Sequence, residues 1–345
     1  MCQYLRQTVL KEEENKTGEG FITGRRDLML MNAKAVIRFA GKFVVLLLLF
    51  ALFFTAGSVA VEGHLPDAET EPGLVPPEAG ILIISAISTL LIMAVITTSR
   101  YSGWRLMAVL AVSYYGVATF MTQIETWYFL AGVTVDEALL LPLFLMGLPV
   151  ALFFIPLAVL ILGKGRAAEP VSILPGQVLI KEWVWRLAAI ALIYLVIYWL
   201  AGYFIAWQNP ELRAFYGSAG EAVPFFAHTL ATLRDDPGLF PFQILRGLLF
   251  SGFALPVIFG SKLEKWGTAV LTGLFLSLPI SVVQIIENPL IPQAGVRFSH
   301  MIETLISTFI FGVIAALLLQ GLLSIGESTS VKGSKGNAGQ GYLLL

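Results

Sequence analysis

Eight long apolar runs constrain this chain more than any other feature of its sequence. They lie near residues 36–60, 80–99, 106–129, 138–162, 185–207, 241–260, 267–288 and 300–323. A helix needs about 20 apolar residues to cross the roughly 30 Å hydrocarbon layer of a bilayer. Lipid offers a backbone no hydrogen-bond partners, so a spanning segment must satisfy its own groups within a helix. The sequence therefore predicts an all-α, polytopic transmembrane helix bundle with about eight spans.

Composition and net charge limit the kinds of partner. The chain is 57% hydrophobic and 13% charged, whereas soluble domains have about 25% charged residues. A formal net charge of −1 excludes the basic excess that is typical of nucleic-acid-binding proteins. Cys2 is the only cysteine, so neither an intramolecular disulfide nor a cysteine-based metal site is available. We expect the lipid bilayer as a partner, no nucleic acid, and a small solute or an ion as the ligand.

The distribution of basic residues predicts the orientation in the membrane. Lys and Arg are retained on the cytoplasmic side of membrane proteins. With the N-terminus inside, all but four of the 22 Lys and Arg fall in cytoplasmic loops, tails or adjoining helix ends. The exceptions are Arg213, Arg234, Arg246 and Arg297. The sequence thus predicts a multi-pass protein of the plasma membrane with both termini in the cytoplasm.

Landmarks in the third and seventh runs suggest an internal duplication. Ser99, Trp104 and Glu125 recur as Ser261, Trp266 and Glu287 at a constant offset of 162 residues. Four spans in each half would return both halves to the same orientation, so the pattern predicts a parallel four-plus-four repeat. The alternative is that interfacial tryptophans and acids at helix ends recur by chance.

The same boundaries give the expected domain organisation. Its five parts are a disordered cytoplasmic tail at 1–35, a four-helix membrane half at 36–163, a cytoplasmic linker at 164–184, a second four-helix half at 185–323 and a disordered cytoplasmic tail at 324–345. Between the fifth and sixth spans, residues 221–236 place Phe225, Phe226, Leu230 and Leu233 along one side. This pattern is typical of a short interfacial helix.

Ionisable residues inside the apolar runs are the candidate functional groups. A charge at the bilayer centre costs about 2.5–3.5 kcal/mol on insertion scales, so such residues normally face protein or water and often mark ion paths. In a transporter, Glu125 and Glu287 would bind a proton or cation near the outer face, with Arg246 as their counter-charge. Gln284 lies one helical turn before Glu287 on the same polar stripe.

Two alternatives remain open from the sequence. In a membrane-embedded metal-dependent hydrolase, His300 and Glu303 would bind a divalent metal together with Glu287, because residues three apart share a helix face. Neither a His-Glu-x-x-His motif nor a Gly-x-Ser-x-Gly motif supports that chemistry, so the enzyme question and the cofactor stay undecided. In a structural or accessory protein, buried pairs such as Arg246–Glu287 and Arg297–Glu303 would fix how helices pack. A transporter or permease is the preferred hypothesis.

Overall fold

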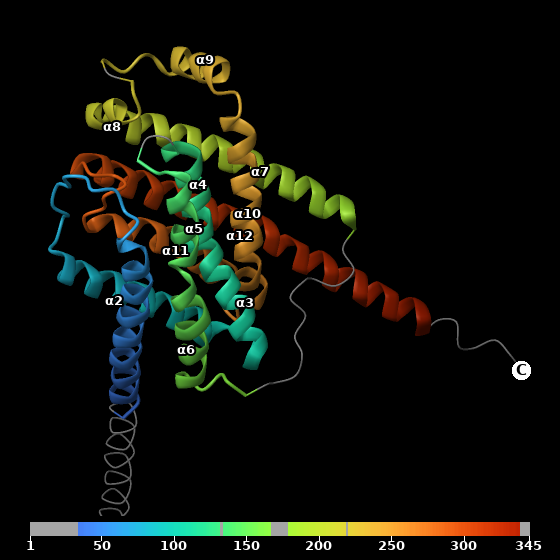
Figure 1. Cartoon of the computed structure of the whole chain (residues 1–345). Coiled ribbons are helices and arrows are strands. Elements are labelled where there is room, and N and C mark those ends of the chain that lie inside the picture. Colours follow the sequence, from blue (N-terminus) through green and yellow to red (C-terminus); the bar gives the residue numbers. More distant parts are fainter. Residues whose placement is uncertain (1–33, 132–133, 167–178, 219, 339–345) are drawn as a thin grey trace, which may run out of the picture. The chain divides into compact units, whose positions relative to one another are not determined.

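The computed structural model describes residues 34–131, 134–166, 179–218 and 220–338, and side chains as far as residue 322. Within these residues it contains helices and no strand, and eight helices are long and apolar enough to cross a membrane. They are Lys34–Glu62, Pro77–Thr98, Gly103–Leu130, Glu137–Ile161, Ile180–Gln208, Leu239–Gly260, Lys265–Ile285 and Ala294–Leu322. The predicted all-α polytopic bundle is therefore confirmed (Figure 1).

Several spans are built from more than one helical segment. α2 (Pro77–Thr98) and α10 (Leu239–Gly260) are continuous, whereas the third span joins α3 (Gly103–Tyr115), a π-helical turn η1 (Gly116–Phe120) and α4 (Met121–Leu130). The fourth span comprises α5 (Glu137–Leu145), η2 (Val150–Phe154) and α6 (Ile155–Ile161), and the fifth comprises α7 (Ile180–Phe204) and η3 (Ala206–Gln208). The seventh comprises α11 (Lys265–Ser281) and η4 (Val282–Ile285), and the eighth lies within α12 (Ala294–Ala338).

Prolines explain why the fourth span is divided. Pro142 lies inside α5, Pro149 directly precedes the π-helical turn η2, and Pro156 occupies the first turn of α6. Each proline lacks the amide hydrogen that an α-helix needs, so the hydrogen-bond ladder is interrupted at these points.

Two short helices connect the fifth and sixth spans. α8 (Pro210–Phe215) is capped at its N-terminus by Asn209, whose side chain accepts a hydrogen bond from the backbone N–H of Glu211 at 2.9 Å. α9 (Phe225–Asp235) has no buried residue, and its Phe226 side chain is 78% exposed. The predicted short helix is confirmed. The ring of His228 stacks on Trp199 at 5.3 Å, and burial lowers the pKa of this histidine.

A short antiparallel contact joins the segment after α2 to the segment after α10. The end of the bundle where it lies is called here the bridge end. Ser99 and Ser261 pair as an isolated β-bridge. The N–H of Arg100 donates to the carbonyl of Gly260 at 2.6 Å, and the N–H of Lys262 donates to the carbonyl of Thr98 at 2.8 Å. The two hydrogen bonds satisfy backbone groups beyond the ends of α2 and α10.

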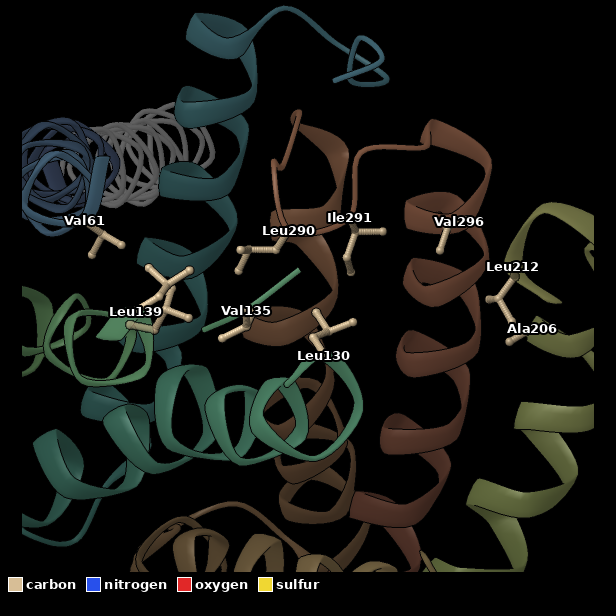
Figure 2. Packing of buried hydrophobic residues seen from close by; sticks show 10 residues of the cluster. Val61, Leu130, Val135, Leu139, Ala206, Leu212, Leu290, Ile291 and Val296 are labelled. Atoms are coloured by element: carbon tan, nitrogen blue, oxygen red, sulfur yellow. The ribbon is translucent and has the colours of Figure 1, made fainter. Parts of the chain in front are cut away.

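The opposite end of the bundle is held by an apolar cluster beneath its loops. Its buried residues come from several spans and loops: Val61, Leu130, Val135, Leu139, Leu143, Ala206, Leu212, Leu290, Ile291 and Val296. Figure 2 labels all of them except Leu143. Polar contacts reinforce the cluster, because the hydroxyl of Thr134 donates to the carbonyl of Leu290 at 3.0 Å.

α11 and α12 form the most extensive helix pair and lie side by side in Figure 1. They meet at two glycines, since a Cβ placed on Gly312 would lie 2.8 Å from the Cα of Gly273. Such small residues let membrane helices approach closely.

α12 continues to Ala338, into the segment that the sequence predicts to be disordered. A helix already started propagates at low cost. The predicted tail at 1–35 lies almost wholly outside the described residues.

The bridge predicts a cross-link. Ser99 and Ser261 form the pair without direct hydrogen bonds between them, for which the Cα separation is about 4.5 Å, within the range that a disulfide accepts. A Ser99→Cys, Ser261→Cys variant in a Cys2→Ser background should form an intramolecular disulfide on mild oxidation, detected by mass spectrometry of the linked peptides. Ser58→Cys with Ser261→Cys is the control and should stay reduced. Two free thiols at 99 and 261 after oxidation would contradict the described contact.

Candidate functional site

A buried ion pair between α4 and α10 lies at the centre of the candidate site. Nη2 of Arg246 lies 2.6 Å from Oε2 of Glu125, and Nη1 lies 3.0 Å from Oε1. The Arg246 side chain is 3% exposed and that of Glu125 is 36% exposed. Two parallel hydrogen bonds of this kind fix the orientation of both groups and are stronger than neutral ones.

Local sequence explains how each partner is placed. Gln243 and Arg246 are three residues apart on α10, so they share a face, and Oε1 of Gln243 accepts from Nη1 of Arg246 at 3.0 Å. Gly247 follows, and a Cβ there would lie 2.7 Å from the Cβ of Tyr194, so glycine allows α7 to approach. Glu125 follows the π-helical turn η1, a feature that often marks functional positions in helices.

Aromatic rings surround the guanidinium. The Cζ atom of Arg246 lies 5.8 Å from the ring centre of Phe250 and 5.9 Å from those of Phe242, Tyr194 and Tyr198. At such distances the negative faces of aromatic rings attract a cation. These rings separate the charge from lipid and help to hold Arg246 in place.

α12 adds a second carboxyl group to the site. Glu303 is 8% exposed, and its carboxylate accepts hydrogen bonds from the hydroxyls of Thr304 at 3.2 Å and Ser307 at 3.5 Å. Both Glu125 and Arg246 act electrostatically on it, so α12 contributes to the same polar cluster as α4 and α10.

A histidine one turn earlier on α12 connects the cluster to the segment after the fifth span. Nε2 of His300 lies 3.1 Å from the hydroxyl oxygen of Tyr216, just beyond α8. Burial raises the pKa of Tyr216, and the negative charges of Glu125 and Glu303 raise it further. The tyrosine therefore stays protonated and can donate or relay a hydrogen bond.

Several buried polar atoms in this region have no hydrogen-bond partner among the described residues. They include Nε of Arg246, Nε2 of Gln243 and Oε1 of Gln123. Gln243 is fully buried. Most buried polar groups in proteins are hydrogen-bonded, so unpaired ones call for an explanation. Two of these atoms, Nε of Arg246 and Nε2 of Gln243, are donors that can hydrogen-bond to an oxygen acceptor of a ligand.

Two other buried arginines give a useful contrast. The guanidinium of Arg297 donates to the carbonyls of Ile291, Pro292, Glu71 and Pro72, and that of Arg213 donates to those of Trp207, Gln208 and Gly220. Both side chains thus fasten loops to helix ends through backbone oxygens. Arg246 alone of the three binds side chains only.

The structure gives Glu287 and Gln284 different surroundings from those of Glu125. α11 ends at Ser281, the 3₁₀ turn η4 contains Gln284, and extended Ile286 then carries Glu287 to an exposed position. This segment packs against residues before α2, where the N–H of Leu74 donates to the carbonyl of Ile285 at 2.8 Å. Arg246 consequently pairs with Glu125 and not with Glu287, unlike the pairing considered for a structural protein.

The proposed metal ligands Glu287, His300 and Glu303 do not come together. Among residues with described positions, no group of three or more His, Cys, Asp or Glu is placed to hold a metal ion. The physical reason is the unwinding at η4, after which the backbone of Glu287 lies against Gly73 in the segment before α2, whereas His300 contacts Tyr216. The considered Arg297–Glu303 pair is also corrected, because Arg297 donates to carbonyls only.

Sequence reasoning overlooked several members of the cluster. Gln243, the α7 tyrosines Tyr194 and Tyr198, and Tyr216 just beyond α8 were not candidates, yet they line the ion pair or contact His300. One signal was available, because Gln243 shares a helix face with Arg246. The tyrosines gave none, since their proximity depends on tertiary packing.

Comparison with known proteins finds no matching family model, no matching curated protein and no matching solved structure.

The ion pair predicts a strong effect of removing one charge. Arg246→Met would leave Glu125 without its partner and should lower the free energy of unfolding by about 3 kcal/mol, the low end for a buried pair because Glu125 is 36% exposed. Chemical unfolding of purified protein in detergent measures this. Adding Glu125→Gln should recover part of the loss. Arg234→Ala, which breaks an exposed pair, is the control, and equal behaviour of Arg246→Met and this control would contradict the prediction.

Proposed function

We propose that this integral membrane protein is a small-solute or ion transporter whose binding site is built on Glu125 and Arg246. The observation that carries the proposal is the partly exposed Glu125 carboxylate, paired to a fully enclosed guanidinium that retains an unpartnered donor. Polar and ionisable groups in membrane spans are costly and commonly line substrate or ion pathways. A ligand carrying an oxygen acceptor fits the free donors of Arg246 and Gln243.

The contrast among buried arginines supports a ligand site over a packing role. An ion pair kept only for packing is expected to be fully hydrogen-bonded, because a partly satisfied buried network is costly. Arg213 and Arg297 meet that expectation with several carbonyl partners each. The Arg246 cluster leaves two buried donors unpaired.

Depth within the bundle is compatible with a site reached from one side. Arg246 lies seven residues after Leu239, where α10 starts, so it is about 10 Å along the helix axis at 1.5 Å per residue. Glu303 lies nine residues after Ala294, the first residue of α12. The cluster is thus between the membrane surface at the end opposite the bridge and the middle of the bundle.

Transport is tested with the purified protein in liposomes on a solid-supported membrane. Concentration jumps of H⁺, Na⁺, K⁺, acetate and glycine are applied, and the charge movement is recorded. We expect a protein-dependent current for at least one of these probes. Glu125→Gln should reduce it by about tenfold or more, because breaking a buried pair costs more than the 1.4 kcal/mol that a factor of ten represents.

The control for transport is Glu182→Gln, which alters an ion pair with Arg186 at the start of α7. It should leave the current unchanged. Folded wild-type protein that gives no more current than protein-free liposomes for every probe would refute transport. The Arg246 cluster would then serve helix packing, as in the structural alternative.

We further propose that the bridge end faces the cytoplasm and that the protein resides in the plasma membrane. Arg100, Lys164 and Lys262 gather at this end. The four basic residues beyond it are accounted for: Arg213, Arg246 and Arg297 are buried, and Arg234 pairs with Asp235. They therefore leave no free positive charge at the opposite end, in agreement with the positive-inside rule.

Thiol labelling tests this orientation. In a Cys2→Ser background, Ala68→Cys and Ser218→Cys should react with a membrane-impermeant maleimide in intact cells, because both positions are exposed at the end opposite the bridge. Glu264→Cys, exposed near the bridge, should react only after permeabilisation. The reverse pattern would invert the orientation, and labelling of none in intact cells would argue against the plasma membrane.

We also propose the parallel four-plus-four repeat. α2 and α10 are both 22 residues long, and their first residues, Pro77 and Leu239, have the same offset of 162 as Ser99 and Ser261. Ser99 and Ser261 also share φ −70° and ψ 141°. Equivalent residues that pair at one end suit two halves of the same orientation, since inverted halves would place them at opposite ends. Failure of the Ser99→Cys, Ser261→Cys cross-link would remove this support.

A further inference from the structure

We propose that Glu303 is a proton-binding carboxyl group, and that the His300–Tyr216 contact connects it to the end of the bundle opposite the bridge. The inference rests on the proposed transport function and assigns H⁺ as the ion that this site takes. It starts from a buried carboxyl that forms no ion pair with any described Lys, Arg or His.

The guanidinium of Arg246, the cation of this cluster, is already paired with Glu125. Both terminal nitrogens of Arg246 bind Glu125, and one of them also binds Gln243. Within the described part of the chain, Glu303 receives hydrogen bonds from the hydroxyls of Thr304 and Ser307 alone, the second at 3.5 Å. Two hydroxyls at these distances compensate little of the cost of burying a full negative charge.

Charged and titratable groups of four other segments interact electrostatically with Glu303: Glu125 from α4, Arg246 from α10, Tyr194 and Tyr198 from α7, and Tyr216 beyond α8. His300, one turn earlier on α12, interacts electrostatically with Glu125. Arg246 supplies one positive charge, and two ionised carboxylates would exceed it. Glu125 is more exposed and bidentate with the guanidinium, so it holds the negative charge while Glu303 takes the proton.

A route for the proton is present in the same cluster. His300 precedes Glu303 by three residues on α12, so the two share a helix face. Nε2 of the imidazole lies 3.1 Å from the hydroxyl oxygen of Tyr216. An incoming H⁺ binds a carboxylate oxygen of Glu303 to give the neutral acid, and its release restores the carboxylate, so each cycle moves one proton and no electrons.

Infrared spectroscopy of the purified protein tests the assignment without requiring transport. At neutral pH the wild type should show the C=O stretch of a protonated carboxyl group, with the usual small shift in D₂O. Glu303→Gln should lose this band. Glu264→Gln, which changes an exposed carboxylate, should keep it.

A second variant protects the test against misfolding. Ser307→Ala keeps Glu303 but removes one of its two hydrogen-bond donors, so it should shift the band without abolishing it. Absence of the band in the folded wild type, or its persistence unchanged in both Glu303→Gln and Ser307→Ala, would overturn the proposal. A band with this behaviour in a protein that moves none of the tested probes would refute transport alone.

Discussion

The free-energy cost of charge in hydrocarbon is the constraint on which the arrangement of this bundle depends. Arg246 and Glu303 lie inside spans where lipid would penalise them, and the surrounding helices turn both inward. As a result, α4 and α10 are joined by the hydrogen bonds between Glu125 and Arg246, and both of these residues interact electrostatically with Glu303 on α12. The aromatic shell from α7 and α10 completes the separation of the guanidinium from lipid.

Hydropathy alone predicted the spans well, because the length of apolar sequence needed to cross a bilayer is a global requirement that local packing does not change. For example, the expected run at 241–260 is the helix Leu239–Gly260, and that at 138–162 is Glu137–Ile161. Helix continuity was harder to predict. The end of α11 at Ser281 depends on η4 and its contacts with residues before α2, which no periodicity reveals.

This local unwinding also explains why the candidate site was only partly predictable. Treating the seventh span as a regular helix to residue 288 places Glu287 beside His300 and Glu303, whereas the extended backbone at Ile286 separates them. From the sequence, both Glu125 and Glu287 were possible partners of Arg246, because both lie near the same end of their spans. The counterpart of Arg246 at the 162-residue offset is Ile84, so if the halves are duplicates, only one retained the ion pair.

The contact of Gly273 with Gly312 has a consequence for how the molecule can rearrange. Gly273 and Gly312 bring the backbones of the two helices into contact, and the ring of Phe309 packs against Gly273, so the crossing is closely packed and resists a displacement of one helix along the other. α11 and α12 should therefore move as a single two-helix body. The position of Glu303, nine residues before Gly312 on the same helix, then depends on a crossing point built on two glycines. The absence of a side chain at these two positions therefore sets how closely the helix that carries Glu303 packs against α11.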